Sequence, residues 1–345
     1  MRGKGINFDT GFFNAGASTR EPFDPEVVRR EMRIIRDDLH CTAVRVTGGD
    51  PDRLEIAAKR AADAGLEVWF CPFTNGLTQD ELLDLLADCA ERAERLRGRG
   101  VKVVLLTGSE VSLFTLGFLP GDTLEERLAL IADPQRVRPV IGAARARMND
   151  FLRRAVETVR ARFGGAVSYA SLPFEGVDWA PFDIIATDAG YRSQETATQH
   201  RDLVRAFVAQ GRAQGKPVAV TEFGCGTFRG AADVAHRGVG TITYGDDGRP
   251  TRLTGDHVRD EAEQAAYLRE LLEVFEAEGV DAAFVYTFAR YDFPHRDDAH
   301  DPRADLDLAS YGVVKVLDGR RGQRYSDMSW EPKAAFDALA DYYRG

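Results

Sequence analysis

Eight short apolar segments, spread along the whole chain and mostly separated by amphipathic helical segments, constrain the fold more than any other feature. The segments are Gly5–Phe8, Thr42–Thr47, Glu67–Phe73, Val101–Thr107, Ala166–Leu172, Phe182–Thr187, Pro217–Thr221 and Ala282–Phe288. Most are near-continuous apolar runs rich in β-branched residues, as is typical of parallel strands that are buried on both faces. Eight such strands that alternate with helices predict an α/β fold, a (β/α)8 TIM barrel.

The segments between the strands carry the usual signals of helix starts and ends. Pro25 follows the potential cap Asp24, and a helix that opens at Pro51 is closed by Gly65. The expected helices are Pro25–Leu39, Pro51–Ala64, Thr78–Arg97, Val140–Phe163, Thr196–Gln214, Asp256–Glu278 and Pro332–Tyr343. Long loops are expected after the fourth, seventh and eighth strands. The first, Val111–Pro139, contains the short helix Leu124–Ile131, and the second, Gly224–Gly255, has the composition of a loop or hairpin.

A doubly wound open sheet is the main alternative architecture. Such a sheet usually carries a glycine-rich phosphate turn after its first strand, and the sequence from Asn7 to Gly11 is not one. The chain has no internal repeat, low-complexity tract or proline- and serine-rich linker. A length of 345 residues is common for a single α/β barrel, so we expect residues 1–345 to form one domain.

The balance of charge excludes several classes of partner. The chain has 45 Lys and Arg against 55 Asp and Glu, a net charge of −10. Nucleic acids and anionic membranes need a basic face, so neither is expected as the main partner. The sequence also lacks a signal-peptide pattern and an apolar run of about 18 residues, which predicts a cytoplasmic, soluble protein. The four cysteines have no metal-binding spacing and are expected to be buried, reduced thiols.

Two glutamates follow strands at the end of the barrel where active sites lie. The fourth strand leads into Ser109-Glu110 and the seventh into Thr221-Glu222, and TIM-barrel sites form at the C-terminal ends of the strands. A carboxylate at the end of an apolar strand costs several kcal/mol to desolvate unless it is paired or partly hydrated. Two carboxyl groups across one barrel mouth are what the cleavage of a glycosidic bond requires.

In this respect the chain resembles the clan A glycoside hydrolases, (β/α)8 barrels with a glutamate at the ends of strands four and seven. The resemblance implies that Glu110 is the acid/base and Glu222 the nucleophile of a retaining mechanism. It implies that Arg45, on the second strand, keeps the nucleophile ionised by charge pairing. It also assigns to Tyr191, just after the sixth strand, a hydrogen bond to the nucleophile. The expected substrate is a small carbohydrate or glycoside.

Two positions depart from the pattern of that clan. The residue before the acid/base is usually an asparagine that binds the sugar 2-hydroxyl, and here it is Ser109. The eighth strand usually ends in a tryptophan on which the sugar stacks, and here Tyr286 and Phe288 stand in its place. The substrate sugar is therefore left open.

Other residues near the strand ends have two interpretations each. Asp9, Glu175 and Asp188 follow strands and could bind substrate hydroxyls or cap loops. Trp179 and Trp330 could stack on a sugar or belong to the core. Glu110 could instead cap the helix that follows it, and Glu222 could pair with a structural arginine. Arg45 could belong to a structural ion pair, and Tyr191 could belong to ordinary loop packing.

Other enzyme classes fit the sequence less well. Lys4, Lys102 and Lys216 lie at the starts of strands, the wrong end for a Schiff-base lysine. The loop from His295 to His300 concentrates His and Asp but lacks a helical His pair or calcium-loop spacing. We therefore expect no metal and no cofactor, and the sequence does not indicate an oligomeric state. The non-enzymatic alternative is a glycosidase-like barrel that binds a carbohydrate or protein partner in a regulatory or defence role.

Overall fold

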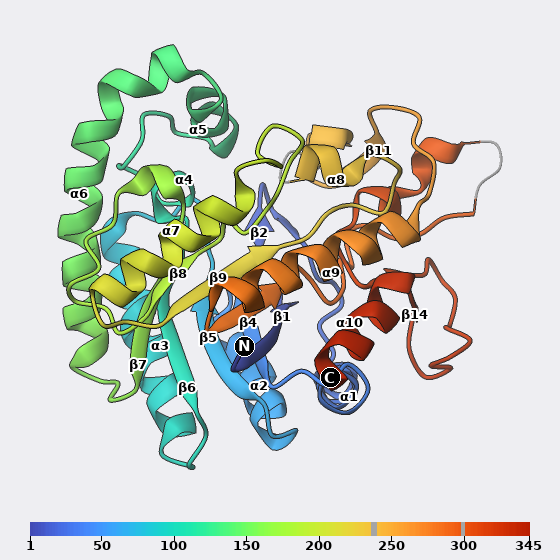
Figure 1. The fold of residues 1–345 in the computed structure, drawn as a ribbon, viewed down its shortest axis with the longest axis horizontal. Helices are drawn as coiled ribbons and strands as arrows, with labels where there is room; N and C mark the ends of the chain where they lie inside the picture. The colour runs from blue at the N-terminus through green and yellow to red at the C-terminus, as the bar shows by residue number, and fades with distance from the viewer. Residues whose placement is uncertain (236–239, 298–300) are drawn as a thin grey trace.

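The computed structural model describes residues 1–235, 240–297 and 301–345, which fold around a closed barrel of eight parallel strands (Figure 1). Around the barrel each strand is hydrogen-bonded to its two neighbours, and β1 pairs with both β4 and β12. The barrel strands are β1 (Gly3–Asp9), β4 (Ala43–Gly48), β5 (Glu67–Pro72), β6 (Val103–Ser109), β7 (Ala166–Ser171), β8 (Ile185–Thr187), β9 (Val218–Phe223) and β12 (Ala282–Val285). The predicted (β/α)8 barrel is confirmed.

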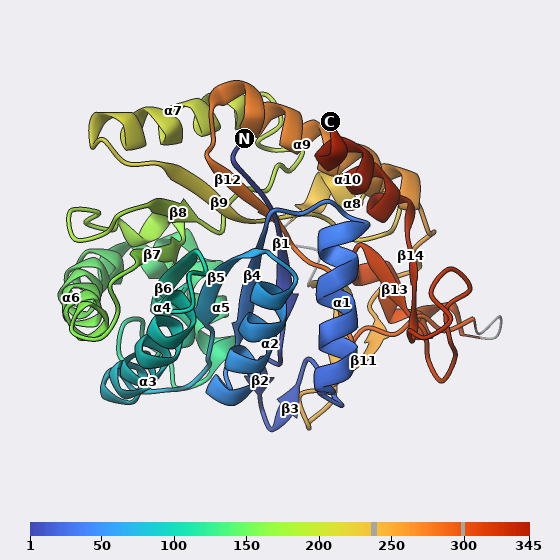
Figure 2. The ribbon, with the colours of Figure 1, turned by 90° about the horizontal axis from the view of Figure 1, so that it is seen from below.

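Helices surround the barrel, with α3 and α6 on one side and α1 and α10 on the other (Figures 1 and 2). The long helices are α1 (Pro25–Asp37), α2 (Pro51–Asp63), α3 (Gln79–Arg97), α6 (Pro134–Arg160), α7 (His200–Ala213), α9 (Glu261–Glu278) and α10 (Ala334–Arg344). Asp24 caps α1 by accepting a hydrogen bond from the backbone N–H of Glu26, and Thr78 and Glu81 form a capping box on α3. Only a short 3-10 turn, η1 (Pro173–Glu175), lies between β7 and β8.

The long connections follow β6, β9 and β12, as the sequence predicts. The first contains α4 (Val111–Phe114), α5 (Leu124–Ile131) and α6; the second contains α8 (Ala231–Val234), β10 (Ile242–Tyr244) and β11 (Pro250–Leu253); the third contains η3 (Pro302–Ala304), η4 (Leu306–Ala309), β13 (Val314–Val316) and β14 (Trp330–Pro332). A small hairpin of β2 (Phe13–Asn14) and β3 (Ala17–Ser18) follows β1. Residues 236–239 and 298–300, within two of the predicted loops, lie outside the described residues.

The start of α6 differs from the sequence-based expectation of Val140. Asp133 caps the helix and Pro134 opens it, so that Pro139 lies inside the helix. Proline in a helix interior removes one backbone hydrogen bond. Pro139 is the sixth residue of the helix, beyond the first four N–H groups that have no helical partner, so α6 continues through it with the loss of that bond. In the sequence Pro139 resembles the end of a loop, whereas the cap at Asp133 determines the observed start of the helix.

Large and small side chains alternate to fill the barrel interior. Trp69 on β5 packs against Phe284 on β12 with ring centroids 4.7 Å apart, and alanines from four other strands line the same space. Gly5 on β1 makes room for this pair, because a Cβ there would lie 2.4 Å from the Phe284 ring. The interior is therefore a packed core below the mouth of the barrel.

The structure confirms that all four cysteines are free and buried. None of the helices in the described part of the chain combines the length and the apolar composition that crossing a bilayer requires.

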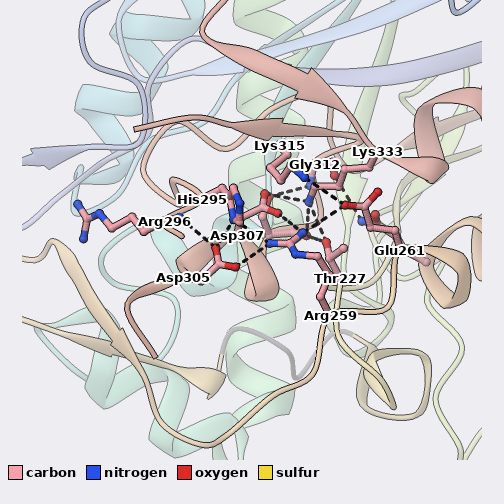
Figure 3. Close-up of polar contacts among 12 residues, drawn as sticks. Thr227, Arg259, Glu261, His295, Arg296, Asp305, Asp307, Gly312, Lys315 and Lys333 are labelled. Atoms are coloured by element: carbon pink, nitrogen blue, oxygen red, sulfur yellow. Dashed lines mark hydrogen bonds and ion pairs between the residues drawn. The ribbon is translucent and has the colours of Figure 1, made fainter. Parts of the chain in front are cut away.

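A buried network of charges joins the connections after β9 and β12 to the C-terminal segment (Figure 3). Arg259 donates to Asp307 and to Asp305, both at 2.8 Å, and Lys333 lies 2.9 Å from the carboxylate of Asp307. The Nδ1 atom of His295 lies 2.9 Å from Asp305. Because burying these charges is costly unless they are paired, the pairs hold the three segments in one arrangement.

We predict that Asp305→Asn lowers the unfolding free energy by about 2 kcal/mol at neutral pH. Burial opposes ionisation of Asp305, but the hydrogen bond with His295 and the charge of Arg259 together hold its pKa below its ordinary value. A carboxyl group with a lowered pKa contributes stability above the unfolded-state pKa, about 3.9, and this contribution disappears as the pH falls through the folded-state pKa. In urea denaturation, the difference between variant and wild type should therefore shrink below about pH 4, and an equal difference at both pH values would contradict the prediction.

Candidate active site

Glu110 lies at the mouth of the barrel in an unusual backbone conformation. It follows the last residue of β6 with φ 48° and ψ 41°, in the left-handed region, and its N–H donates to the carbonyl of Ala170 at 2.9 Å. Few non-glycine residues adopt this conformation, and it persists only where surrounding contacts hold it. Such residues are concentrated at functional sites.

Tyr169 and Glu175 hold the turn that follows Glu110. The N–H of Val111 donates to the Tyr169 hydroxyl at 2.8 Å, and that hydroxyl donates to Glu175 at 2.8 Å. Glu175 also accepts hydrogen bonds from the N–H and the hydroxyl of Ser112, at 3.2 and 2.6 Å. Glu175 is 1% exposed and its acceptors are occupied by the protein, so it positions this turn and does not reach a substrate. Burial raises its pKa to about 7.

A cluster around Arg45 occupies the centre of the mouth. Arg45, on β4, extends across the barrel, and its Nη1 atom lies 2.9 Å from both Asp188 and Glu222. The hydroxyl of Tyr191 donates to the other oxygen of Glu222 at 3.3 Å. The side chains of Arg45 and Asp188 are fully buried, whereas that of Glu222 is 11% exposed. The structure thus brings together the predicted nucleophile, its arginine and its tyrosine.

Ser109 lies beside this cluster, but its hydroxyl already makes a hydrogen bond within the protein. Its hydroxyl donates to Asp188 at 2.6 Å. Because a hydroxyl has a single proton, Ser109 has none left to donate to a sugar while this bond is made. Asp188 accepts from both Ser109 and Arg45 and has no exposed surface, so it is not placed to bind substrate hydroxyls as the sequence analysis allowed.

Asn7, which is not predicted from the sequence, completes the cluster. Its side-chain amide donates to the carbonyl of Thr221 at 2.8 Å, and its oxygen accepts from Arg45 at 3.3 Å. Asn7 therefore joins β1 to β9 directly below Glu222. A buried amide in an otherwise apolar strand is the signal that could have identified it.

The electrostatics of the two glutamates differ. Burial raises the pKa of Glu110 well above its ordinary value, and the charges of Asp188 and Glu222 raise it further. Burial and Asp188 also raise the pKa of Glu222, but Arg45 and Tyr191 oppose this by stabilising its ionised form. Within the described residues, no side chain donates a hydrogen bond to the Glu110 carboxyl group. A proton shared by the two groups is therefore held more favourably on Glu110.

Of the two aromatic residues predicted at the end of the eighth strand, only Tyr286 lies near the site. Its hydroxyl accepts from Arg290 at 3.3 Å, and burial raises its pKa, to which the charge of Glu222 adds. Phe288 is instead fully buried between Phe8 and Trp330, with ring centroids at 6.3 and 5.3 Å. Because β12 ends at Val285, strand alternation does not determine the direction of these side chains.

Trp179 and Trp330 are not brought to the mouth. Trp179 is buried against Phe182, and its carbonyl accepts from Lys216, just before β9 begins. It therefore lies at the opposite end of the barrel from Glu110. The connection from β7 to β8 runs from the C-terminal end of the barrel back to its N-terminal end. The sequence does not show at which end a residue of this connection lies. Trp330 is buried and donates to Glu31 at 3.1 Å.

Asp9 follows β1 and organises the loop that begins there. Its carboxylate accepts from the N–H of Gly11 at 2.9 Å and from the hydroxyl of Thr19 at 2.6 Å. These bonds fit the loop-capping interpretation of Asp9.

Three phenylalanines that the sequence analysis did not select form a cluster beside the mouth. Phe12, Phe73 and Phe114 follow β1, β5 and Glu110 respectively, and their ring centroids lie 4.8 to 5.4 Å apart. All three are partly exposed. Partly exposed aromatic rings at a rim offer apolar faces to a ligand.

The structure contains no group of three or more potential metal ligands within residues 1–235, 240–297 and 301–345. Of the His- and Asp-rich loop, His295 belongs to the buried network of Figure 3, whereas His300 lies outside the described residues.

Comparison with known proteins supports the fold assignment. No protein-family model and no curated protein sequence matches the chain. Among solved structures, the chain is similar to a GH113 β-1,4-mannanase, with 16% identity, a TM-score of 0.62 and full coverage of both chains. It is also similar to a GH113 β-mannanase from Alicyclobacillus acidocaldarius in complex with ManMIm (17% identity, TM-score 0.59, 99% and 97% coverage) and to a β-glucosidase (13% identity, TM-score 0.52, 100% and 98% coverage). The chain therefore has the (β/α)8 fold of these glycoside hydrolases.

We predict that Tyr169→Phe destabilises the protein more than Tyr343→Phe. Both substitutions remove one buried hydroxyl, but Tyr169 bridges Val111 and Glu175, whereas Tyr343 makes a single hydrogen bond to Gly5 at 2.9 Å. Losing the bridge leaves a buried N–H and a buried carboxyl group short of a partner, which costs about 1–3 kcal/mol for each group left unpaired. Urea denaturation of the two variants measures the difference, and equal destabilisation would show that the bridge does not hold the turn.

Proposed function

We propose that the protein is a glycoside hydrolase that cleaves an O-glycosidic bond by a retaining mechanism, with Glu110 as acid/base and Glu222 as nucleophile. The observation that carries this proposal is the contrast between the two carboxyl groups at one barrel mouth. Glu222 contacts Arg45 and Tyr191, which stabilise its anion, while Glu110 lies among carboxylates that favour its protonated form. The shared fold with solved mannanases and a glucosidase supports the same conclusion.

In the first step, a Glu222 oxygen attacks the anomeric carbon as the bond to the leaving oxygen breaks. The Glu110 proton moves to that oxygen, and the sugar remains covalently attached to Glu222. In the second step, Glu110 accepts a proton from water, the resulting hydroxyl bonds to the anomeric carbon, and Glu222 is released. This mechanism requires the two carboxyl groups to lie about 5–5.5 Å apart.

The expected substrate is a small or terminal sugar unit on a neutral or cationic glycoside. The net charge of −10 disfavours a polyanionic substrate. The cluster of Phe12, Phe73 and Phe114 supplies aromatic faces suited to sugar rings at the rim.

One observation favours a second function, a barrel that binds a carbohydrate or protein partner without turnover. The Ser109 hydroxyl donates to Asp188, and Phe288 is buried in the core, so the side chains at two positions that contact sugar in the clan are occupied by contacts within the protein. A panel of aryl glycosides separates the two functions, because binding without turnover releases no aryl alcohol.

We predict that Glu222→Ala reduces hydrolysis of aryl glycosides by at least about 10³-fold, because the reaction loses its nucleophile. Glu110→Ala should reduce kcat/KM by about 10² to 10⁴-fold on glycosides with poor leaving groups. It should reduce kcat/KM much less on dinitrophenyl glycosides, whose leaving group needs no proton. Asp281→Asn, at the amino-terminal end of the barrel, serves as a control that retains activity. Activity that survives the loss of Glu222 would refute its role as nucleophile.

We also predict a bell-shaped dependence of kcat/KM on pH, displaced to higher pH than unperturbed glutamates would give. Because the pKa of Glu222 is raised, its ionisation, and with it the acidic limb, falls above the ordinary value of about 4.3. Activity should then decline as the pH rises through the pKa of Glu110, and Glu110→Gln should remove this basic limb. A rate that does not change between about pH 5 and 8 would be inconsistent with these assignments.

A further inference from the structure

The Nη1 atom of Arg45 is approached by more acceptors than its two hydrogens can serve. This atom lies 2.9 Å from both Asp188 and Glu222, and also 3.1 Å from the carbonyl of Thr221 and 3.3 Å from the side-chain oxygen of Asn7. A guanidinium Nη atom carries two hydrogens, so four acceptors compete for two donors. Each acceptor other than Glu222 weakens the hold of Arg45 on the proposed nucleophile.

Asp188 is the strongest of these competitors, because it is charged and firmly placed. Its second oxygen lies 3.4 Å from Nη2 of Arg45 and accepts the Ser109 hydroxyl at 2.6 Å. Its backbone N–H donates to Ser171 at 3.0 Å, which fixes it at the end of β8. With both oxygens bonded and no exposed surface, Asp188 acts on the reaction only through its neighbours.

The charges of the cluster do not balance. Arg45 is the one cationic side chain that contacts these carboxyl groups within the described residues, whereas Asp188, Glu222 and Glu110 contribute three acidic groups. With all three ionised, the cluster carries a net charge of −2 in a largely buried space. Such a site favours holding at least one proton, and like charges shift the ionisation of their neighbours to higher pH.

We propose that Asp188, held in place by Ser109, is a positioning residue that shares Arg45 with Glu222 and thereby moves the working pH range of the site upward. This inference rests on the proposed glycosidase function, and it gives Ser109 a role in place of the missing asparagine. After burial, the charge of Asp188 is the largest cause of the raised pKa of both Glu110 and Glu222. A single substitution of Asp188 should therefore shift the titration midpoints of Glu110 and Glu222 in the same direction.

The test uses Asp188→Asn in the full-length protein with ¹³C-labelled glutamate carboxyl groups. Carboxyl NMR signals are followed against pH, and Glu110→Gln and Glu222→Gln assign the two resonances. Asparagine keeps the shape of Asp188 and removes its charge, so the midpoints of Glu110 and Glu222 should both fall by about one pH unit. Both limbs of the kcat/KM profile should move to lower pH by matching amounts. Unchanged midpoints would overturn the proposal.

Two further variants make the result specific. Asp188→Ala also removes the charge and must lower the same midpoints, which keeps the proposal testable if Asp188→Asn does not fold. Ser171→Ala is the matched control, because it removes a buried hydroxyl at the end of β7 that donates to the carbonyl of Ala186 at 2.7 Å and touches no carboxylate. The backbone carbonyl of residue 171, which accepts the N–H of Asp188, is kept. It should leave both midpoints unchanged. If this control shifted the midpoints as much as Asp188→Asn does, the effect would come from a general disturbance of the packing, and the proposal would be overturned.

The NMR titration needs no turnover, so it separates this inference from the proposed function. If no glycoside is hydrolysed, the function fails, and the midpoints still show whether Asp188 controls the ionisation of the two glutamates. If glycosides are hydrolysed and Asp188→Asn leaves the midpoints and the pH profile unchanged, the function stands and this inference fails.

Discussion

The arrangement of the candidate site depends on one buried cation, Arg45. A fully desolvated guanidinium is costly unless it is paired and hydrogen-bonded. Its partners come from the far side of the barrel: Asp188 and Glu222 follow Arg45 by 143 and 177 residues in the sequence. The barrel must therefore close for Arg45 to be satisfied, and once it closes, the same contacts place Glu222 at the mouth. The contacts that Arg45 needs in the closed barrel are therefore the same contacts that position the proposed nucleophile.

Glu110 is positioned by a different mechanism. No cation contacts its carboxyl group within the described residues; instead, the backbone is held in a left-handed turn by Tyr169 and Glu175. The two glutamates thus share one barrel mouth, and their environments favour different protonation states. Such a division is how two residues of the same type take opposite roles in acid–base chemistry.

Much of the fold was predictable because it follows from local patterns. Apolar runs identify the strands, and the caps Asp24 and Thr78 place the starts of α1 and α3 within one residue. The predictions from sequence are wrong where two local signals conflict or where a regular strand pattern stops. Pro139 resembles a loop residue although the capped helix begins before it, and Phe288 lies just beyond β12, where alternation no longer indicates direction. Trp179 lies at the wrong end of the barrel for a sugar contact because its connection crosses the full height of the strands.

The sequence by itself determined the alternation of strands and helices, and therefore that Glu110 and Glu222 lie at the same end of a barrel, since parallel strands share one direction. Only the tertiary structure decided which other polar residues meet them. Glu175 and Asp188 both follow strands and look alike in the sequence, yet one supports the turn after Glu110 and the other competes for Arg45. The difference arises because burial and hydrogen-bond partners are set by residues distant in the chain, which come together only when the barrel closes.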